Sequence, residues 1–136
     1  GLGFGDNTKA MLMTRGLTEM ARLGVSLGAQ KQTLAGLSGI GDLIVTCTSL
    51  HSRNNRAGIL IGQGATPEQA MEQVGAGVEG YYAAKTAWAL CQQQQVEMPI
   101  IHAAYQALYE HVDARQAVAD LLTRQRKAES EDAGWL

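Results

Sequence analysis

Apolar residues recur at intervals of three and four positions along most of this 136-residue chain, and glycine or proline separates one such run from the next. This spacing places the apolar side chains of each run on one face of an α-helix. The clearest helix start lies at residues 66–69, where the threonine can cap, the proline suits the first helical position and the glutamine completes a capping box. Six or seven such patterns with little strand character predict an all-α domain of orthogonally packed helices.

The helices are predicted from their caps and their apolar faces. A cap at Asp6 or Asn7 starts the first helix and Gly28 ends it, whereas Ser52 starts a helix that ends at Gly62 and Gly64. Short helices are also expected at 30–37 and 43–49. The predicted buried positions are Met13, Leu17, Met20, Gly24 and Leu27 in the first helix, then Tyr81, Ala84, Trp88 and Cys91, then Ile101, Ala104, Tyr105 and Leu108 after Pro99, and finally Ala117, Val118, Leu121 and Leu122 after Asp113. Residues 1–127 are expected to form the domain, and 128–136 a polar tail.

Cysteine content and charge narrow the class of protein. The two cysteines, Cys47 and Cys91, are far apart and fit reduced thiols of a cytosolic protein better than a disulfide framework or a zinc site. A formal net charge of -2 with 18% charged residues disfavours a nucleic-acid-binding surface. The longest apolar runs are far too short for a membrane span, and no signal sequence opens the chain. We therefore expect a soluble, cytoplasmic protein with no metal site, no membrane span and no nucleic-acid partner.

The residues around position 53 are the best candidates for binding an anion. Ser52, Arg53 and Asn54 bring a hydroxyl, a guanidinium and an amide to a predicted helix N-terminus, where free N–H groups and the helix dipole favour negative charge. The guanidinium of Arg53 adds a fork of donors that matches a phosphate. Taken alone, these residues also fit an ordinary capped helix with solvated charges.

Other polar residues in glycine-rich segments offer two interpretations each. Asp42 follows a tight turn, where its carboxylate could orient a substrate hydroxyl or cap the next turn. Thr46 shares the face of Asp42 if this segment is helical, and otherwise is a buried hydroxyl. Glu79 lies in a glycine-dense loop that lets a ligand approach the backbone, or it caps the next helix. Lys9 fits a solvated or ion-paired role better than that of a general acid. The three histidines lack metal-ligand spacing, so none is assigned a role.

Four segments, in their order and separations, resemble the C-terminal domain of bacterial NAD(P)-dependent glycerol-3-phosphate dehydrogenase. They are GLGFGDNTKAMLMTRGLTEM (1–20), GLSGIGDLIVTCTSLHSRNNR (36–56), GVEG (77–80) and VEMPI (96–100). The succession of GDLIVTCTS, SRNNR and GVEG is the most specific part. The resemblance covers residues 1 to about 127 and implies the all-α fold of the C-terminal domains of 6-phosphogluconate dehydrogenase-like enzymes.

The resemblance also implies a function and a set of site residues. Such enzymes interconvert dihydroxyacetone phosphate and sn-glycerol 3-phosphate with NADH or NADPH, and supply glycerophospholipid synthesis. The positions that the resemblance assigns to the substrate are Asp42, Thr46, Ser52, Arg53 and Asn54. Those that it assigns to the cofactor are Arg53, Gly77 and Glu79, although relatives usually carry an apolar residue where Gly77 stands. Asn55 also departs from the family pattern, since many relatives carry a second arginine there.

The remaining expectations concern the parts that the chain lacks. Since the chain opens on glycine in GLGFGD, we expect it to be a fragment that follows an N-terminal dinucleotide-binding domain, which would hold most of the NAD or NADP. The resemblance implies a general acid/base lysine upstream of Gly1, so no catalytic residue is expected within these residues. A homodimer is the default assembly. The alternative is a non-catalytic helical module that binds phosphorylated ligands or mediates dimerisation.

Overall fold

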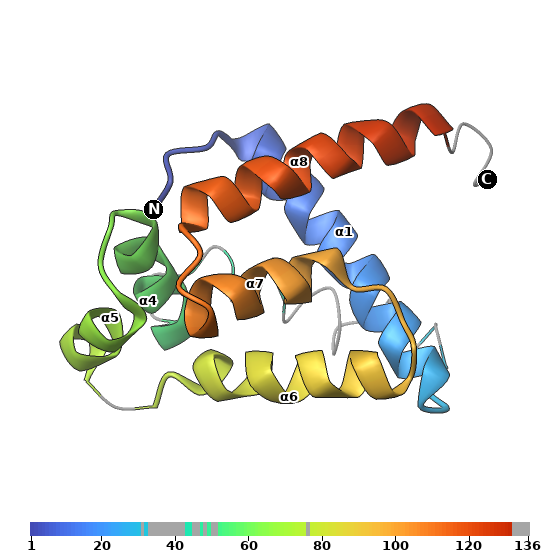
Figure 1. The fold of residues 1–136 in the computed structure, drawn as a ribbon, viewed down its shortest axis with the longest axis horizontal. Helices are drawn as coiled ribbons and strands as arrows, with labels where there is room; N and C mark the ends of the chain where they lie inside the picture. The colour runs from blue at the N-terminus through green and yellow to red at the C-terminus, as the bar shows by residue number, and fades with distance from the viewer. Residues whose placement is uncertain are drawn as a thin grey trace.

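The computed structural model describes residues 1–30, 32, 43, 44, 47, 49, 52–75 and 77–131, with side chains as far as Arg124. Within these ranges the chain forms six bounded helices and no strand (Figure 1). The helices are α1 (Asp6–Ser26), α4 (Arg53–Gly62), α5 (Pro67–Val74), α6 (Glu79–Gln93), α7 (Pro99–Tyr109) and α8 (Ala114–Glu131). The predicted all-α class is confirmed.

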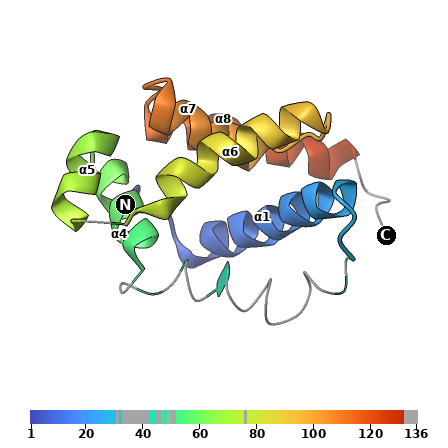
Figure 2. The same ribbon diagram turned by 90° about the horizontal axis from the view of Figure 1, so that it is seen from below.

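The helices form two layers with a helical pair at one end. Helices α6, α7 and α8 lie side by side in one layer, and α1 forms the other (Figures 1 and 2). Helices α4 and α5 pack against each other near the N-terminus of the chain (Figure 1). In Figure 1, α1 runs steeply across α7 and α8, in agreement with the predicted orthogonal packing.

Helix α1 ends as predicted but begins differently. Its N-cap is Gly5, which makes no side-chain capping bond, so the prediction that Asp6 or Asn7 caps this helix is wrong. Asp6 is instead the first helical residue, where its negative charge faces the positive end of the helix dipole. At the other end Gly28 adopts a φ of +97°, and the N–H of Ala29 reaches back to the carbonyl of Gly24 at 2.8 Å. These bonds form the glycine-terminated motif expected there.

The capping residues predicted for α4 and α5 are present. The Ser52 hydroxyl accepts a hydrogen bond from the N–H of Asn55 at 3.2 Å. In the capping box of α5, Thr66 accepts from the N–H of Gln69 at 3.1 Å, and the Gln69 side chain accepts from the N–H of Thr66 at 2.9 Å. Gly64, with a φ of +111°, ends α4. Local capping chemistry therefore sets the limits of both helices.

The core is small, and it differs from the prediction most in α1. Met20 is 38% exposed and Leu27 is 54% exposed, so their predicted burial is wrong, whereas Glu19 is only 5% exposed. The reason is that the Glu19 carboxylate binds the start of α7, which turns the neighbouring Met20 away; Leu27 lies beyond the last helical residue. In the part of the chain that the structure describes, the buried apolar residues are Ala57, Pro67, Ala70, Val78, Ala84, Cys91, Met98, Ala117 and Leu121.

The structure tests the predicted tail, the two short helices and the absence of a membrane span only in part. Helix α8 continues to Glu131, so the proposed division between domain and tail at residue 127 falls inside a helix and stays a prediction. Of the predicted helices at 30–37 and 43–49, only residues 30, 32, 43, 44, 47 and 49 are described, and the rest lie outside the described residues. Among described residues, no helix is both long and apolar enough to cross a bilayer.

Candidate functional site

The described site residues gather where two helices begin. Ser52, Arg53 and Asn54 lie at the N-terminus of α4, and Gly77 and Glu79 lie at the N-terminus of α6. Arg53 lies against Gly77, and Asn54 binds the N–H of Gly80, so these two contacts join the two helix starts. The predicted substrate residues Asp42 and Thr46 lie outside the described residues.

Ser52 acts first as a helix cap. Its hydroxyl oxygen accepts the N–H of Asn55, which satisfies one of the free donors at the start of α4. A serine hydroxyl can accept one hydrogen bond and still donate its own proton. Ser52 can therefore cap the helix and donate to an anion in front of it.

Arg53 extends across to the loop before α6. An added Cβ on Gly77 would meet Nη1 of Arg53 well inside van der Waals distance, and would lie 3.4 Å from Cζ. The guanidinium therefore fills the space that a side chain at position 77 would take. Arg53 itself is exposed, so its charge is available to a ligand from solvent.

Asn54 caps α6 from α4. Its Oδ1 accepts a hydrogen bond from the N–H of Gly80 at 2.9 Å, and Gly80 is the second residue of α6. The N-cap residue of α6 is Val78, whose side chain cannot accept a hydrogen bond. Because Oδ1 is used in this way, Asn54 faces a ligand with its Nδ2 donor. The sequence did not reveal this partner, since Asn54 and Gly80 are 26 positions apart.

Glu79 is the first residue of α6 and is exposed. A carboxylate in the first helical turn is stabilised by the positive end of the helix dipole, in line with the structural interpretation of this residue. Its exposure also leaves both oxygens free to accept hydrogen bonds from hydroxyl groups of a ligand.

A cavity of about 450 Å³ lies between α1 and α4, with Asn54 on its wall. Its lining residues are Gly1, Lys9, Leu12, Met13, Gly16, Leu43, Cys47, Asn54, Asn55, Gly58, Ile59 and Ile100. Burial raises the pKa of the Cys47 thiol on this wall, and the ammonium of Lys9 lowers it only in part. The volume is in the usual range of small-molecule sites. Sequence reasoning treated Lys9 as a solvated residue and did not find this cavity.

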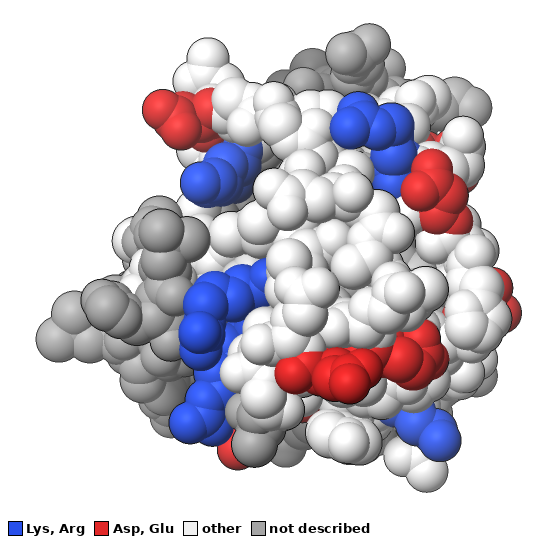
Figure 3. Space-filling model, turned by 90° about the vertical axis from the view of Figure 1, so that its left-hand side faces the viewer, with Lys and Arg blue, Asp and Glu red and all other residues white. Residues whose placement is uncertain are grey.

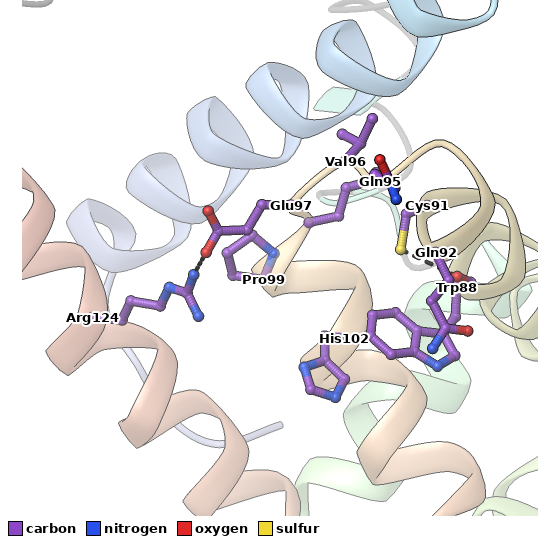
Figure 4. A pocket seen from close by; sticks show the side chains of 10 residues that line it. Trp88, Cys91, Gln92, Gln95, Val96, Glu97, Pro99, His102 and Arg124 are labelled. Carbon is purple, nitrogen blue, oxygen red and sulfur yellow. Dashed lines mark hydrogen bonds and ion pairs between the residues drawn. The ribbon is translucent and has the colours of Figure 1, made fainter.

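A second cavity, of about 330 Å³, lies at the other end of α6 (Figure 4). On its wall the rings of Trp88 and His102 stack with centroids 4.3 Å apart, so His102 packs against an aromatic side chain. Arg124 and Glu97 form an ion pair at its edge (Figure 4). Among described residues, no group of three or more His, Cys, Asp or Glu side chains could hold a metal ion.

Charged side chains on the face shown in Figure 3 lie in small separate groups. Basic and acidic groups alternate there with wide neutral areas. No broad field of one sign covers the described part of this face.

Two helix N-termini, a guanidinium and a donor amide meet in this helical domain, and the chemistry of these groups suits an anion. Comparison with known proteins identifies the family. A family model described as the NAD-dependent glycerol-3-phosphate dehydrogenase C-terminus matches residues 1–119, and the chain belongs to this family.

Individual relatives agree with this assignment. Over 129 residues, the chain is 54% identical to glycerol-3-phosphate dehydrogenase (NAD(P)+) of Clostridium perfringens, covering 95% of this chain and 39% of that protein. The Desulfitobacterium hafniense protein of the same name is 52% identical over 136 residues, covering 100% of this chain and 39% of that protein. A crystal structure of the Coxiella burnetii glycerol-3-phosphate dehydrogenase matches with a TM-score of 0.87 and 43% identity, over 89% of this chain and 37% of that chain. The chain thus spans about two fifths of the length of these relatives, and the predicted fold is confirmed.

Proposed function

We propose that this chain is the substrate-binding part of an NAD(P)-dependent glycerol-3-phosphate dehydrogenase, which interconverts dihydroxyacetone phosphate and sn-glycerol 3-phosphate. The observation that carries the proposal is the convergence of α4 and α6 through the Arg53–Gly77 and Asn54–Gly80 contacts. Both helices direct their free N–H groups and positive dipole ends toward this junction. The relatives from Clostridium perfringens and Desulfitobacterium hafniense are both named glycerol-3-phosphate dehydrogenase (NAD(P)+), which supports the proposal.

The proposed role of the site is to hold the phosphate while the carbonyl carbon reacts elsewhere. Arg53 would bind two phosphate oxygens with parallel N–H donors, and Asn54 Nδ2 and the Ser52 hydroxyl would add one donor each. A fixed phosphate orients the remaining carbons of a three-carbon substrate, and such positioning accounts for much of the rate of a reaction between two bound molecules. Asp42 and Thr46 remain proposed substrate residues on the resemblance alone.

Three residues at the junction fit a dinucleotide in their chemistry. Arg53 offers a cation to a phosphate, Glu79 offers an exposed acceptor to ribose hydroxyls, and Gly77 is exposed and presents its backbone without a side chain. NADH or NADPH, when bound, supplies the hydride. We propose Arg53, Gly77 and Glu79 as the contribution of this chain to cofactor binding, with the larger part in an N-terminal domain. A homodimer, a cytoplasmic location and a role in phospholipid synthesis stay predictions.

The test uses the full-length protein that carries this chain. Binding of sn-glycerol 3-phosphate is measured by titration calorimetry in the natural protein, in Arg53→Ala and in the control Arg124→Ala. We expect Arg53→Ala to weaken binding about tenfold, because a charge-assisted pair at an exposed residue contributes on the order of 1.4 kcal/mol. Arg124→Ala removes the same charge near the opposite end of α6, where its partner is Glu97, and should leave binding unchanged.

Two results would contradict the proposal. Equal affinity of the natural protein and Arg53→Ala would show that the phosphate does not bind at the α4–α6 junction. Failure of the full-length protein to oxidise NADH or NADPH with dihydroxyacetone phosphate would contradict the proposed reaction. The 136-residue chain alone should fold but show no turnover, since the proposed base and most of the cofactor site lie outside it.

A further inference from the structure

Gly77 differs from its neighbours in the loop before α6 by what lies in the place of its missing side chain. It has a φ of +78°, and the Arg53 guanidinium occupies the position of a Cβ. Gly75, in the same loop, has a φ of +102° and nothing within 4 Å of the corresponding position. Both glycines satisfy a positive φ, but only Gly77 also makes room for another residue.

The consequence is a place for Arg53 that its own helix does not provide. Arg53 is exposed at the first position of α4, where a long side chain can adopt many rotamers. The open space at Gly77 accommodates the guanidinium at the junction of α4 and α6, and a side chain at position 77 would exclude it from there.

The neighbouring contact has the same form. A Cβ on Gly80 would lie 2.9 Å from Oδ1 of Asn54, so this glycine also makes room for a side chain from α4. Arg53 and Asn54 are thus both seated on glycines at the start of α6. The loop before α6 and the first turn of α6 thus leave space for the side chains of two consecutive residues of α4.

We propose that Gly77 is the positioning residue for Arg53: the absence of a side chain at position 77 leaves room for the guanidinium at the place where it binds the phosphate of an organic phosphate ester. This inference rests on the proposed function. It assigns to Gly77 a role in substrate binding through Arg53, in addition to the cofactor contact implied by the family resemblance.

The experiment is a double-mutant cycle in the full-length protein, with sn-glycerol 3-phosphate as the probe in titration calorimetry. The variants are Gly77→Ala, Arg53→Ala and the double variant, with Gly75→Ala as the matched control. Gly75→Ala also places a side chain at a positive φ in the same loop, but without displacing Arg53. Gly77→Asn serves as a second variant, because asparagine tolerates positive φ while still adding a Cβ.

A positioning role predicts non-additive effects. Gly77→Ala and Gly77→Asn should weaken binding at least threefold in the presence of Arg53, and less than 1.5-fold (about 0.24 kcal/mol) once Arg53 is alanine. Gly75→Ala should leave affinity unchanged. Equal losses in both backgrounds, or no loss in either Gly77 variant, would overturn the inference while leaving Arg53 as a phosphate ligand. If Arg53→Ala itself changed nothing, the proposed function would fail and the positioning role with it.

Discussion

Substitution of the buried Glu19 tests directly how α1 and α7 are held together in this fold. Its two oxygens accept hydrogen bonds from the N–H groups of Ile100 and Ile101, at 2.6 and 3.3 Å. These are the second and third residues of α7, whose N-cap residue, Met98, makes no side-chain capping bond. Glu19 therefore caps α7 from the middle of α1. We predict that Glu19→Ala destabilises the chain by about 2–4 kcal/mol.

The magnitude follows from opposing contributions. A hydrogen bond to a charged group contributes about 1.5–3 kcal/mol, and the longer of the two bonds belongs at the low end of this range. Proximity to the positive end of the α7 dipole adds roughly 0.3–1 kcal/mol. Against these, burial of the carboxylate at 5% exposure costs free energy and raises its pKa. Removal of the side chain leaves two N–H groups without their acceptor, and this loss dominates.

Thermal unfolding of the 136-residue chain, followed by far-ultraviolet circular dichroism, measures the effect. For a domain of this size we expect Glu19→Ala to lower Tm by on the order of 10 °C. Glu72→Ala is the control, because Glu72 is exposed on α5. A loss below about 0.5 kcal/mol for Glu19→Ala, within the range of ordinary surface substitutions, would refute the capping role.

The pH dependence of the same variant gives an independent check. Burial raises the pKa of Glu19 above its usual range, although the bonds from Ile100 and Ile101 and the charges of Arg22 and Arg124 lower it in part. A raised folded-state pKa means that the folded chain binds the proton more tightly than the unfolded chain. The contribution of this titration to stability is therefore full below the unfolded-state pKa and is lost as pH rises through the folded-state pKa. The deficit of Glu19→Ala should shrink over that interval; a deficit that grows would contradict the sign.

Two further predictions concern other positions. Gln95 follows the end of α6 with a φ of 54°, a left-handed conformation that favours glycine. Gln95→Gly should therefore stabilise the chain by about 0.5–1 kcal/mol in denaturant unfolding. Gln94→Gly, at a right-handed position, should not, and no gain at Gln95 would contradict the argument. The second prediction concerns the thiols, since burial raises the pKa of both. Because Cys91 is 2% exposed while Cys47 is half-buried near Lys9, a chromogenic aromatic disulfide near neutral pH should label Cys47 first. Mass spectrometry of the labelled peptides measures this order, and equal rates would count against it.

Helix limits were predictable where the signal is local. The capping box at Thr66 and the terminal glycines at Gly28 and Gly64 depend on residues within five positions of one another, and all are present. The buried face of α1 was not predictable to the same degree. Periodicity defines a stripe, but Glu19 rotates the helix toward α7, and this contact is 81 positions away in the sequence.

The candidate site also has residues that the sequence predicts and contacts that it does not. Arg53 and Asn54 were predicted because their residue types at a helix N-terminus favour an anion. Their partners, Gly77 and Gly80, depend on how α4 packs on α6, which composition and spacing do not specify. The position of Lys9 beside a cavity has the same origin, since the wall opposite comes from α4 and from residues 43 and 47.

One sequence feature, an apolar residue at a helix N-cap, indicates contacts between residues that are distant in the sequence. Helices α6 and α7 have the apolar residues Val78 and Met98 at their N-caps, so neither helix can satisfy its first N–H groups with its own N-cap side chain. In each case the missing acceptor is supplied by a distant helix, through Asn54 for α6 and Glu19 for α7. An apolar N-cap on a well-defined helix therefore indicates that its first N–H groups take an acceptor from elsewhere, which can be a distant side chain, water or a ligand. The sequence shows that such an acceptor is needed, and only the packing of the helices determines which group supplies it.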